Sequence, residues 1–446
     1  NQPIGTVVGE LIASGLPGKN IEYSLEIVGA QDFPKFSDFG QKIHNDSTSA
    51  HLFRLVDLNN DGWLDWIDSH GKLYHGMDGS FTLGHDFSYS GVVEVGDFDQ
   101  DGFIDVFFGK WNDTDKIFFG DATNSYTRQL ILTGPDSPES DSIALDFDSD
   151  GDLDIVLAHT RGVNGRILIN SGDGNFTSFT NSDTPNLQRY LTRADFNNDG
   201  LIEFADAYYS GAWENNGTSI TRRANIYQVL QVSSTLGEMN SGDLDNDGLV
   251  DVIAIYPGDT NAEDKTGMFI AWNKDGGQTF EKGPTLGRGT YKFTGVDLGD
   301  LDLDGDLDIF ATTTSEGLIY INDGKGNFNL SSNIIPLEGA KEVMLEDFDK
   351  DGDLDAAIAG PHEIWKNLAQ ETKYNFFTLD TNGTLRTATI FDYENNASTY
   401  TIRVQAKDEY NTTVEGNFTV SVEDVFEDLD GDGIEDHLDD DMDGDG

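Results

Sequence analysis

Short apolar runs alternate with acidic, glycine-containing clusters along most of this chain. Val92–Val95 enters such a cluster, and Ile155–Ala158 leaves another. A third run follows, as in Ile167–Asn170, and a Gly-rich turn then leads to a fourth, as in Gly172–Phe176. Short runs bounded by turn residues are typical of strands. The pattern therefore predicts units of four short antiparallel β-strands.

The acidic cluster in each unit is a nonapeptide with the pattern D-x-[DN]-x-D-G-x-x-[DE]. The first copy spans Asp57–Asp65, and further copies begin at Asp97, Asp146, Asp195, Asp243, Asp300 and Asp347. Successive starts differ by 40, 49, 49, 48, 57 and 47 residues. A near-constant period of this length indicates a repeat architecture. Four strands per repeat, seven times, predict an all-β chain with a seven-bladed β-propeller.

The last repeat lacks a clear fourth strand after Glu363–Lys366. The segment Phe33–Gly40 precedes the first repeat, has recurring aromatic residues and is typical of a single strand. We expect this segment to supply the missing strand and close the ring.

The nonapeptide carries oxygen ligands at positions 1, 3, 5 and 9 and glycine at position 6, where a sharp turn is needed. The backbone carbonyl of position 7 adds a further ligand. Calcium accepts six to eight oxygens in flexible geometry, whereas magnesium requires a strict octahedron. No Cys or His occupies a ligand position, which argues against zinc. Position 12 is never Glu, so the loop is not an EF-hand.

About seven calcium ions are thus predicted, and we interpret them as staples for the fold that take no part in chemistry. A lone copy would equally suit an acidic hairpin turn, but seven copies at near-constant spacing favour metal sites. The predicted ligands are Asp57, Asn59, Asp61, Trp63, Asp65, Asp97, Asp99, Asp101, Phe103, Asp105, Asp146, Asp148, Asp150, Asp152, Asp154, Asp195, Asn197, Asp199, Leu201, Glu203, Asp243, Asp245, Asp247, Leu249, Asp251, Asp300, Asp302, Asp304, Asp306, Asp308, Asp347, Asp349, Asp351, Asp353 and Asp355.

The segments that flank the repeats lose this pattern. Thr6–Leu11 and Ile21–Ile27 alternate near the start of the chain, and Thr399–Ala406 and Asn417–Val422 alternate near its end. Two strands alone are not a stable unit. We therefore interpret residues 1–31 and 373–425 as one β-sandwich, with the propeller (residues 32–372) inserted between its second and third strands.

Residues 426–446 are almost entirely acidic residues and glycine. With so few apolar residues the tail cannot form a core, so we expect it to be ordered only with calcium. Its ligands on the same 1-3-5-9 template are Asp428, Asp430, Asp432 and Asp436.

The chain has 446 residues, with 27 Lys and Arg against 82 Asp and Glu, a net charge of −55. Such a charge makes nucleic acid and anionic membranes poor partners. Cysteine is absent and no apolar run approaches the roughly 18 residues of a membrane helix. So many calcium loops favour an extracellular bacterial setting, because the millimolar calcium outside the cell fills even weak sites. No signal peptide is visible at Asn1, so we expect a leader or upstream domains.

The nonapeptides resemble the FG-GAP and VCBS repeats of integrin-α-type propellers over about residues 33–370. The flanks resemble a bacterial cadherin-like domain through motifs such as Phe377-Thr-Leu-Asp380 and Phe391-Asp392-Tyr-Glu394. That resemblance implies further calcium ligands at Asp392, Glu394, Asp408 and Asp424. The tail resembles a thrombospondin type 3 repeat.

The resemblance also implies which face is left free. In such propellers the calcium loops join the first and second strands at one face, and the other loops build the opposite face. By counting from each nonapeptide we place there Trp111, His159, Arg161, Arg189, Tyr208, Tyr209, Trp213, Tyr256, Arg288, Tyr291 and His362. Aromatic faces stack on sugars and Arg pairs with carboxylate or sulfate. In the alternative interpretation, the aromatic residues pack between blades and the cations balance local acids.

Three functions remain open. The first is a calcium-stabilised extracellular adhesion or ligand-binding module of a larger surface or secreted protein, which binds carbohydrate or a protein partner. The second is a polysaccharide lyase or hydrolase, as occurs among related propellers; however, the chain lacks H-E-x-x-H and G-x-S-x-G. The third is a self-assembling subunit of a calcium-dependent surface filament. We favour the first and expect no enzyme activity.

Overall fold

The computed structural model describes residues 6–12, 20–28, 36–43, 52–77, 80–110, 114–132, 139–159, 165–179, 187, 190–207, 211–230, 236–256, 266–369, 377–388, 399–410 and 412–421. The chain divides into two compact units. The larger unit holds residues 36–330 and 334–367, and the smaller one holds residues 1–35, 331–333 and 368–446. In the described part of the chain, no helix is long and apolar enough to span a membrane.

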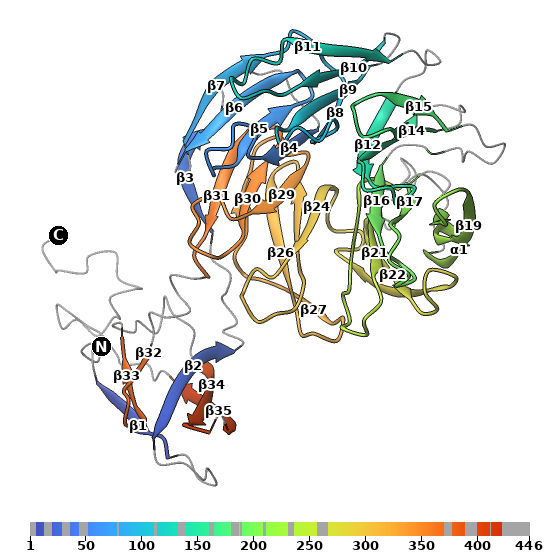
Figure 1. Ribbon diagram of the computed structural model, residues 1–446. Helices are drawn as coiled ribbons and strands as arrows, with labels where there is room; N and C mark the ends of the chain where they lie inside the picture. Colours follow the sequence, from blue (N-terminus) through green and yellow to red (C-terminus); the bar gives the residue numbers. More distant parts are fainter. Residues whose placement is uncertain are drawn as a thin grey trace, which may run out of the picture. The chain divides into compact units, whose positions relative to one another are not determined.

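The larger unit is built from repeated antiparallel sheets (Figure 1). Within the described residues there are seven such sheets, six of four strands and one of five. The first three sheets contain β4 (Phe53–Val56), β5 (Asp65–Asp68), β6 (Lys72–Met77) and β7 (Ser80–Asp86); β8 (Val92–Gly96), β9 (Asp105–Gly109), β10 (Asp115–Phe119) and β11 (Arg128–Leu132); and β12 (Glu139–Leu145), β13 (Asp154–His159), β14 (Arg166–Asn170) and β15 (Phe176–Ser178).

The fourth and fifth sheets contain β16 (Leu191–Ala194), β17 (Glu203–Asp206), β18 (Gly211–Asn215) and β19 (Ile220–Asn225); and β20 (Met239–Gly242), β21 (Asp251–Tyr256), β22 (Gly267–Asn273) and β23 (Phe280–Leu286). The sixth contains β24 (Phe293–Gly299), β25 (Asp308–Thr313), β26 (Glu316–Asn322), β27 (Phe328–Leu330) and β28 (Ile335–Pro336). The seventh contains β29 (Val343–Glu346), β30 (Asp355–Ile358), β31 (Glu363–Asn367) and β3 (Phe36–Lys42), and a short helix, α1 (Ile226–Leu230), follows β19. The predicted four strands per repeat are thus confirmed.

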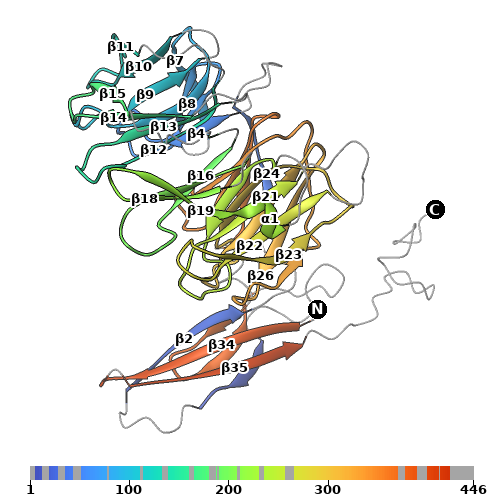
Figure 2. The same ribbon diagram turned by 90° about the vertical axis from the view of Figure 1, so that its right-hand side faces the viewer.

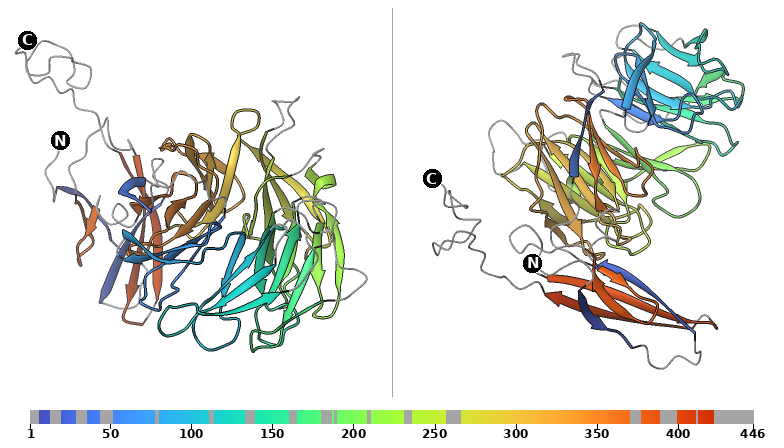
Figure 3. Two further views of the ribbon diagram at one scale, coloured as in Figure 1. Left: turned by 90° about the horizontal axis from the view of Figure 1, so that it is seen from above. Right: turned by 90° about the vertical axis from the view of Figure 1, so that its left-hand side faces the viewer.

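The sheets stand side by side with their first strands toward the centre of the unit (Figures 1 and 2). Seen from above, they follow one another around the unit in chain order (Figure 3, left). Strand β3 pairs antiparallel with β31, with Phe36 opposite Asn367 and Lys42 opposite Glu363. The early segment therefore supplies the fourth strand of the last sheet, as predicted. Pairing between the two ends of the repeat array leaves fewer open sheet edges.

The core lies between neighbouring sheets. Position 2 of each nonapeptide is buried there, and these residues are Leu58, Phe98, Phe147, Phe196, Leu244, Leu301 and Phe348. One apolar cluster joins the first sheet to the last: Phe53 and Trp66 stack with ring centroids 3.9 Å apart, and Phe348 meets Phe81 at 6.3 Å. Packing of aromatic rings thus joins the two ends of the array as β-pairing does.

The smaller unit pairs strands from the two ends of the chain. One sheet contains β1 (Val7–Glu10), β33 (Thr384–Thr387) and β32 (Phe377–Leu379). The other contains β2 (Ile21–Val28), β34 (Thr399–Asp408) and β35 (Thr413–Ser421). Ile402, Val404 and Ala406 of β34 are buried. That this unit is a cadherin-like sandwich interrupted by the propeller stays a prediction.

The contact between the first and last sheets gives a test of closure. We expect Phe348→Ala to lower the free energy of unfolding by about 3–5 kcal/mol, because it removes a large buried side chain and leaves a cavity. Leu330→Ala is the control, since Leu330 on β27 is 42 % exposed and should change little. Urea unfolding in the presence of calcium measures the free energy of unfolding of both variants. Equal losses in the two would refute a stabilising contact between the first and last sheets.

Candidate metal centres

Each nonapeptide links the first strand of a sheet to the second, and its backbone is the same in all seven copies. Position 4 is a non-glycine residue in the left-handed region, with φ of 56–64°, as at Asn60, Gln100 and Asn246. Position 6 is glycine with φ between 86° and 99°, from Gly248 to Gly352. Few other residues adopt that conformation without strain. The predicted sharp turn at glycine is confirmed.

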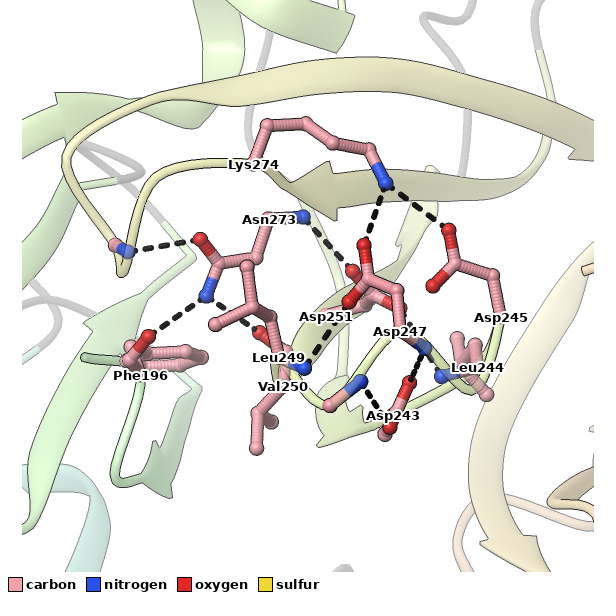
Figure 4. A network of polar contacts seen from close by, with 12 residues as sticks. Phe196, Asp243, Leu244, Asp245, Asp247, Leu249, Val250, Asp251, Asn273 and Lys274 are labelled. Atoms are coloured by element: carbon pink, nitrogen blue, oxygen red, sulfur yellow. Dashed lines mark hydrogen bonds and ion pairs between the residues drawn. The ribbon is translucent and has the colours of Figure 1, made fainter. Parts of the chain in front are cut away.

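Backbone N–H groups fix the carboxylates, as the fifth nonapeptide illustrates (Figure 4). Asp243 accepts from the N–H of Asp247 at 3.2 Å and from the N–H of Gly248 at 2.9 Å. Asp247 in turn accepts from the N–H of Leu249 at 3.0 Å. The side chains at positions 1 and 5 are therefore held within the turn.

The residue at position 9 opens the second strand and is fully enclosed. Asp251 is 0 % exposed, and it accepts from the N–H of Leu244 at 3.0 Å and from the N–H of Asn273 at 2.8 Å (Figure 4). Asp308 accepts in the same way from Leu301 and Asn322. Position 9 thus joins its own turn to the third strand of the sheet, in addition to its predicted role as a metal ligand.

Carboxylate oxygens converge in these loops. Groups of three have one oxygen each within 4.8 Å of one another, and they include Asp97, Asp99 and Asp101; Asp146, Asp148 and Asp154; Asp195, Asp199 and Glu203; Asp243, Asp245 and Asp251; and Asp300, Asp302 and Asp304. Oxygen ligands at this spacing suit a hard divalent cation. The predicted ligand positions 1, 3, 5 and 9 therefore come together in space, and these clusters could hold calcium.

Burial and like charge make several position 9 carboxylates poor anions by themselves. Desolvation raises the pKa of Asp105 to about 7 and that of Asp308 to about 8, with neighbouring carboxylates adding to the effect. A divalent cation stabilises the deprotonated form of each ligand. The arrangement is thus electrostatically complementary to a bound cation.

Neighbouring nonapeptides are linked through position 4. Asn60 donates to the carbonyl of Gly102 at 3.3 Å, and Asn198 donates to that of Gly248 at 3.0 Å. At the junction of the last and first copies, the Lys350 ammonium lies 4.0 Å from the ring centroid of Trp63. These neighbouring loops therefore contact one another along one edge of the sheets.

Asparagines at the ends of third strands form a second link. Asn273 donates to the carbonyl of Val250 in its own repeat at 3.1 Å and to that of Phe196 in the preceding repeat at 2.8 Å. Asn170, Asn215 and Asn322 make the same pair of bonds. Sequence reasoning missed this role, although an asparagine before a Gly-containing turn recurs in these repeats.

The FG-GAP-like repeat family matches residues 97–157, 146–205, 243–311 and 300–358, which together make up half of the chain. This chain belongs to the FG-GAP-like repeat family. The matched segments begin at the first residues of four nonapeptides, so those carboxylate clusters lie in the loops of FG-GAP-like repeats.

Solved structures similar to this FG-GAP repeat protein include propellers. An Agrocybe aegerita lectin that recognises non-reducing terminal N-acetylglucosamine is 18 % identical over 66 % of this chain and 81 % of that one, with a TM-score of 0.47. The β-propeller domain of Myceliophteria thermophila Cps50 (Swd1) is 10 % identical over 74 % and 99 %, with a TM-score of 0.47. The V. cholerae biofilm matrix protein Bap1 is 12 % identical over 87 % and 100 %, with a TM-score of 0.38. No curated protein sequence matches the chain.

Basic side chains lie against some of the FG-GAP loops. The Lys274 ammonium lies 3.0 Å from Asp245 and 2.9 Å from Asp247 (Figure 4). Although burial alone would lower it, the hydrogen bonds to both carboxylates raise the pKa of Lys274. Lys366 contacts Asp349 and Asp351 in the same way, at 2.5 and 3.1 Å. Sequence reasoning missed both lysines; the only signal is a lysine next to the strand-ending asparagine.

The first nonapeptide contacts another residue that sequence reasoning missed. His75 Nδ1 lies 3.2 Å from Asp65 and 3.2 Å from the amide of Asn59. The hydrogen bond to Asp65 raises the pKa of His75 despite partial burial. No ligand spacing in the sequence marks this histidine, because it comes from β6 and reaches the loop only in the folded sheet.

Three residues predicted for the opposite face are enclosed. Tyr256 is 1 % exposed against Phe269, and His159 and His362 are 0 % and 1 % exposed. Their prediction as ligand contacts is therefore corrected: counting places a residue in or near a loop, but the direction of its side chain depends on the neighbouring sheet. For Tyr256, the alternative interpretation of packing between sheets holds.

The other predicted contact residues stay predictions. Trp213 is half-buried and donates to Asp206 at 2.9 Å, Tyr291 is half-buried beside Phe293, and Arg288 is exposed. Outside the described residues lie Trp111, Arg161, Arg189, Tyr208 and Tyr209, and also the predicted metal ligands Asp392, Glu394, Asp424, Asp428, Asp430, Asp432 and Asp436. Asp408 is buried and accepts the N–H groups of Tyr410 and Thr412, both at 2.9 Å.

The position of Lys274 yields a test of the fifth loop. We expect Lys274→Met to tighten calcium binding there by about tenfold or more, because the ammonium repels the incoming ion and holds two of its ligands. Calcium titration calorimetry measures the change. The matched control is Lys282→Met on β23, whose ammonium lies above the Phe269 ring instead. An unchanged calcium isotherm for K274M would contradict the prediction.

His159 gives a pH test. Burial, and then the charge of Arg166, lowers its pKa from 6.5 to about 4. Between these values the unfolded chain binds a proton that the folded chain does not, so stability is lost as pH falls. Between pH 7 and pH 4, we expect the free energy of unfolding of His159→Gln to fall by about 2–3 kcal/mol less than that of the wild type. Urea unfolding measures both, and parallel curves over that range would contradict the assignment.

Proposed function

We propose that this chain is a calcium-stabilised, extracellular ligand-binding or adhesion module of a bacterial surface or secreted protein. The observation that carries the proposal is the convergence of carboxylate oxygens within 4.8 Å in loop after loop of an FG-GAP repeat array. Without a cation these groups repel one another. A medium with millimolar calcium fills even weak oxygen sites, and it suits a chain of net charge −55.

The ligand would bind at the ends of the sheets opposite the FG-GAP loops, and its class would be carbohydrate or protein. Arg288 and Tyr291, in the turn after β23, support this choice, because one is exposed and the other half-buried. An exposed guanidinium and an aromatic ring in the same turn are suited to acidic sugars and to carboxylate side chains. The carboxylate clusters occupy the other ends of the strands, so calcium would act through stability of the scaffold.

Calcium removal tests the stabilising part of this proposal. A site that binds only the folded state contributes about 2.7 kcal/mol when calcium is at a hundred times Kd. Several such sites should raise the melting temperature by about 10 °C or more. Differential scanning calorimetry with calcium and with EDTA measures the shift, and no shift would refute the proposal.

A variant of one loop refines the test. Asp300→Asn removes a charge from a converging group and should reduce the calcium-dependent shift in melting temperature. The control is Glu281→Gln, an exposed acid on β23. A glycan array probed with and without calcium then tests the ligand class. Binding lost in Arg288→Ala would support the proposed face, and binding unaffected by it would count against that face.

A further inference from the structure

The first strands of the seven sheets line a cavity of about 490 Å³ in the larger unit. Side chains at alternate positions of a strand share one face. In every repeat, the residue three positions before the start of the nonapeptide lines this cavity. These residues are Arg54, Glu94, Ile143, Thr192, Asn240, Asp297 and Met344. In most repeats, the residue five positions before the start of the nonapeptide lines the cavity as well, and Asp141, Glu238 and Glu342 are among these residues. Two layers of side chains from distant repeats thus form a channel.

Acidic groups outnumber basic groups in this channel. The lining holds six carboxyl groups and two guanidinium groups: Glu94, Asp141, Glu238, Asp297, Glu342 and Glu346 with Arg54 and Arg193. Arg54 lies 3.2 Å from Glu94 and 3.7 Å from Asp141. Asp297 is held by the amide of Asn240 at 2.6 Å and by the N–H groups of Leu298 and Leu345. Local partners therefore account for three of the six acids.

Glu342 differs from these three. Its side chain lines the channel and the residue is 8 % exposed, yet its Oε2 has no hydrogen-bond partner among the residues that the structure describes. A buried polar atom in that state is costly unless a ligand satisfies it. Burial raises the pKa of Glu342 to about 8 against the opposing charge of Arg54. Burial, followed by the charge of Glu342, likewise raises the pKa of Glu238, which is half-buried in the same layer.

We propose that the channel binds a small organic cation with two or more protonated amines, held by Glu342 and Glu238. The volume lies in the range of about 300–1,000 Å³ typical of ligand pockets and far exceeds that of a single ion. Ile143 and Met344 line the adjacent layer beside the acids, and apolar side chains suit the methylene groups between ammonium groups. A metal ion would leave that apolar surface unused. The inference goes beyond the proposed function, because it adds a second ligand, in the channel, and does not depend on calcium in the loops.

Spermidine titrated into the full, calcium-saturated chain tests the proposal by calorimetry. Salt at about 0.15 M screens attraction to the exposed acidic surface. We expect one spermidine per chain and at least a tenfold weaker Kd in Glu342→Gln and in Glu238→Gln. Glu281→Gln, an exposed acid on β23, is the matched control and should bind as the wild type does.

Two outcomes would overturn the proposal. The first is a titration in which spermidine gives no binding heat, or in which its Kd is the same for E342Q as for E281Q. The second is that spermidine does not bind and that E342Q binds one calcium ion fewer per chain than the wild type. That result would make the channel a metal site. Glu342 also accepts a backbone hydrogen bond from Phe53 and faces the charge of Arg54, so the isosteric Glu342→Gln is chosen to preserve the packing. Half-buried Glu238 provides a second variant if the melting temperature of E342Q falls. Melting that is insensitive to EDTA would refute the proposed function alone, because spermidine binding is measured separately.

Discussion

The buried carboxylate at position 9 is the interaction on which the larger unit depends. Asp251 accepts one N–H from its own turn and one from the third strand of its sheet, and it also faces the carboxylates of Asp243 and Asp245. Its two hydrogen bonds hold the loop and the sheet in register, but burial raises its pKa to about 7. The same group that organises the fold is thus unstable as an anion until a positive charge lies beside it. A divalent cation would stabilise the deprotonated form of this carboxylate.

This constraint spreads from sheet to sheet because the loops are physically connected. Asn273 binds carbonyls in two successive repeats, and Asn198 reaches the carbonyl of Gly248 in the next loop. Beneath these bonds, Phe196 and its equivalents pack between the sheets. An ion bound in one loop would therefore stabilise the backbone that its neighbour uses. A repeat array with such contacts gains cooperativity along its length, and the pairing of β3 with β31 joins its two ends.

Features set by neighbours in sequence were predictable, and features set by distant neighbours were not. The nonapeptide, its glycine turn, the four strands and the convergence of Asp97, Asp99 and Asp101 all follow from short-range spacing. By contrast, the burial of His159 and Tyr256 depends on which sheet packs against them. Lys274 meets Asp245 and Asp247 only because β22 runs beside β21. Composition gave the excess of acid, but only the assembled strands place Glu342 and Arg54 in one channel.

The chain thus handles surplus carboxylate in three physically distinct ways. In the FG-GAP loops, oxygens held within 4.8 Å by the turn form small cages suited to a single hard ion. At Lys274, a covalently attached ammonium satisfies two of those oxygens, so the loops are not equivalent in their demand for metal. In the channel, the acids stand on or next to strands of five different sheets around a space of about 490 Å³, too wide for one ion to satisfy them together. Size and rigidity, rather than charge alone, distinguish the loops, which suit one hard ion, from the wider channel, which does not.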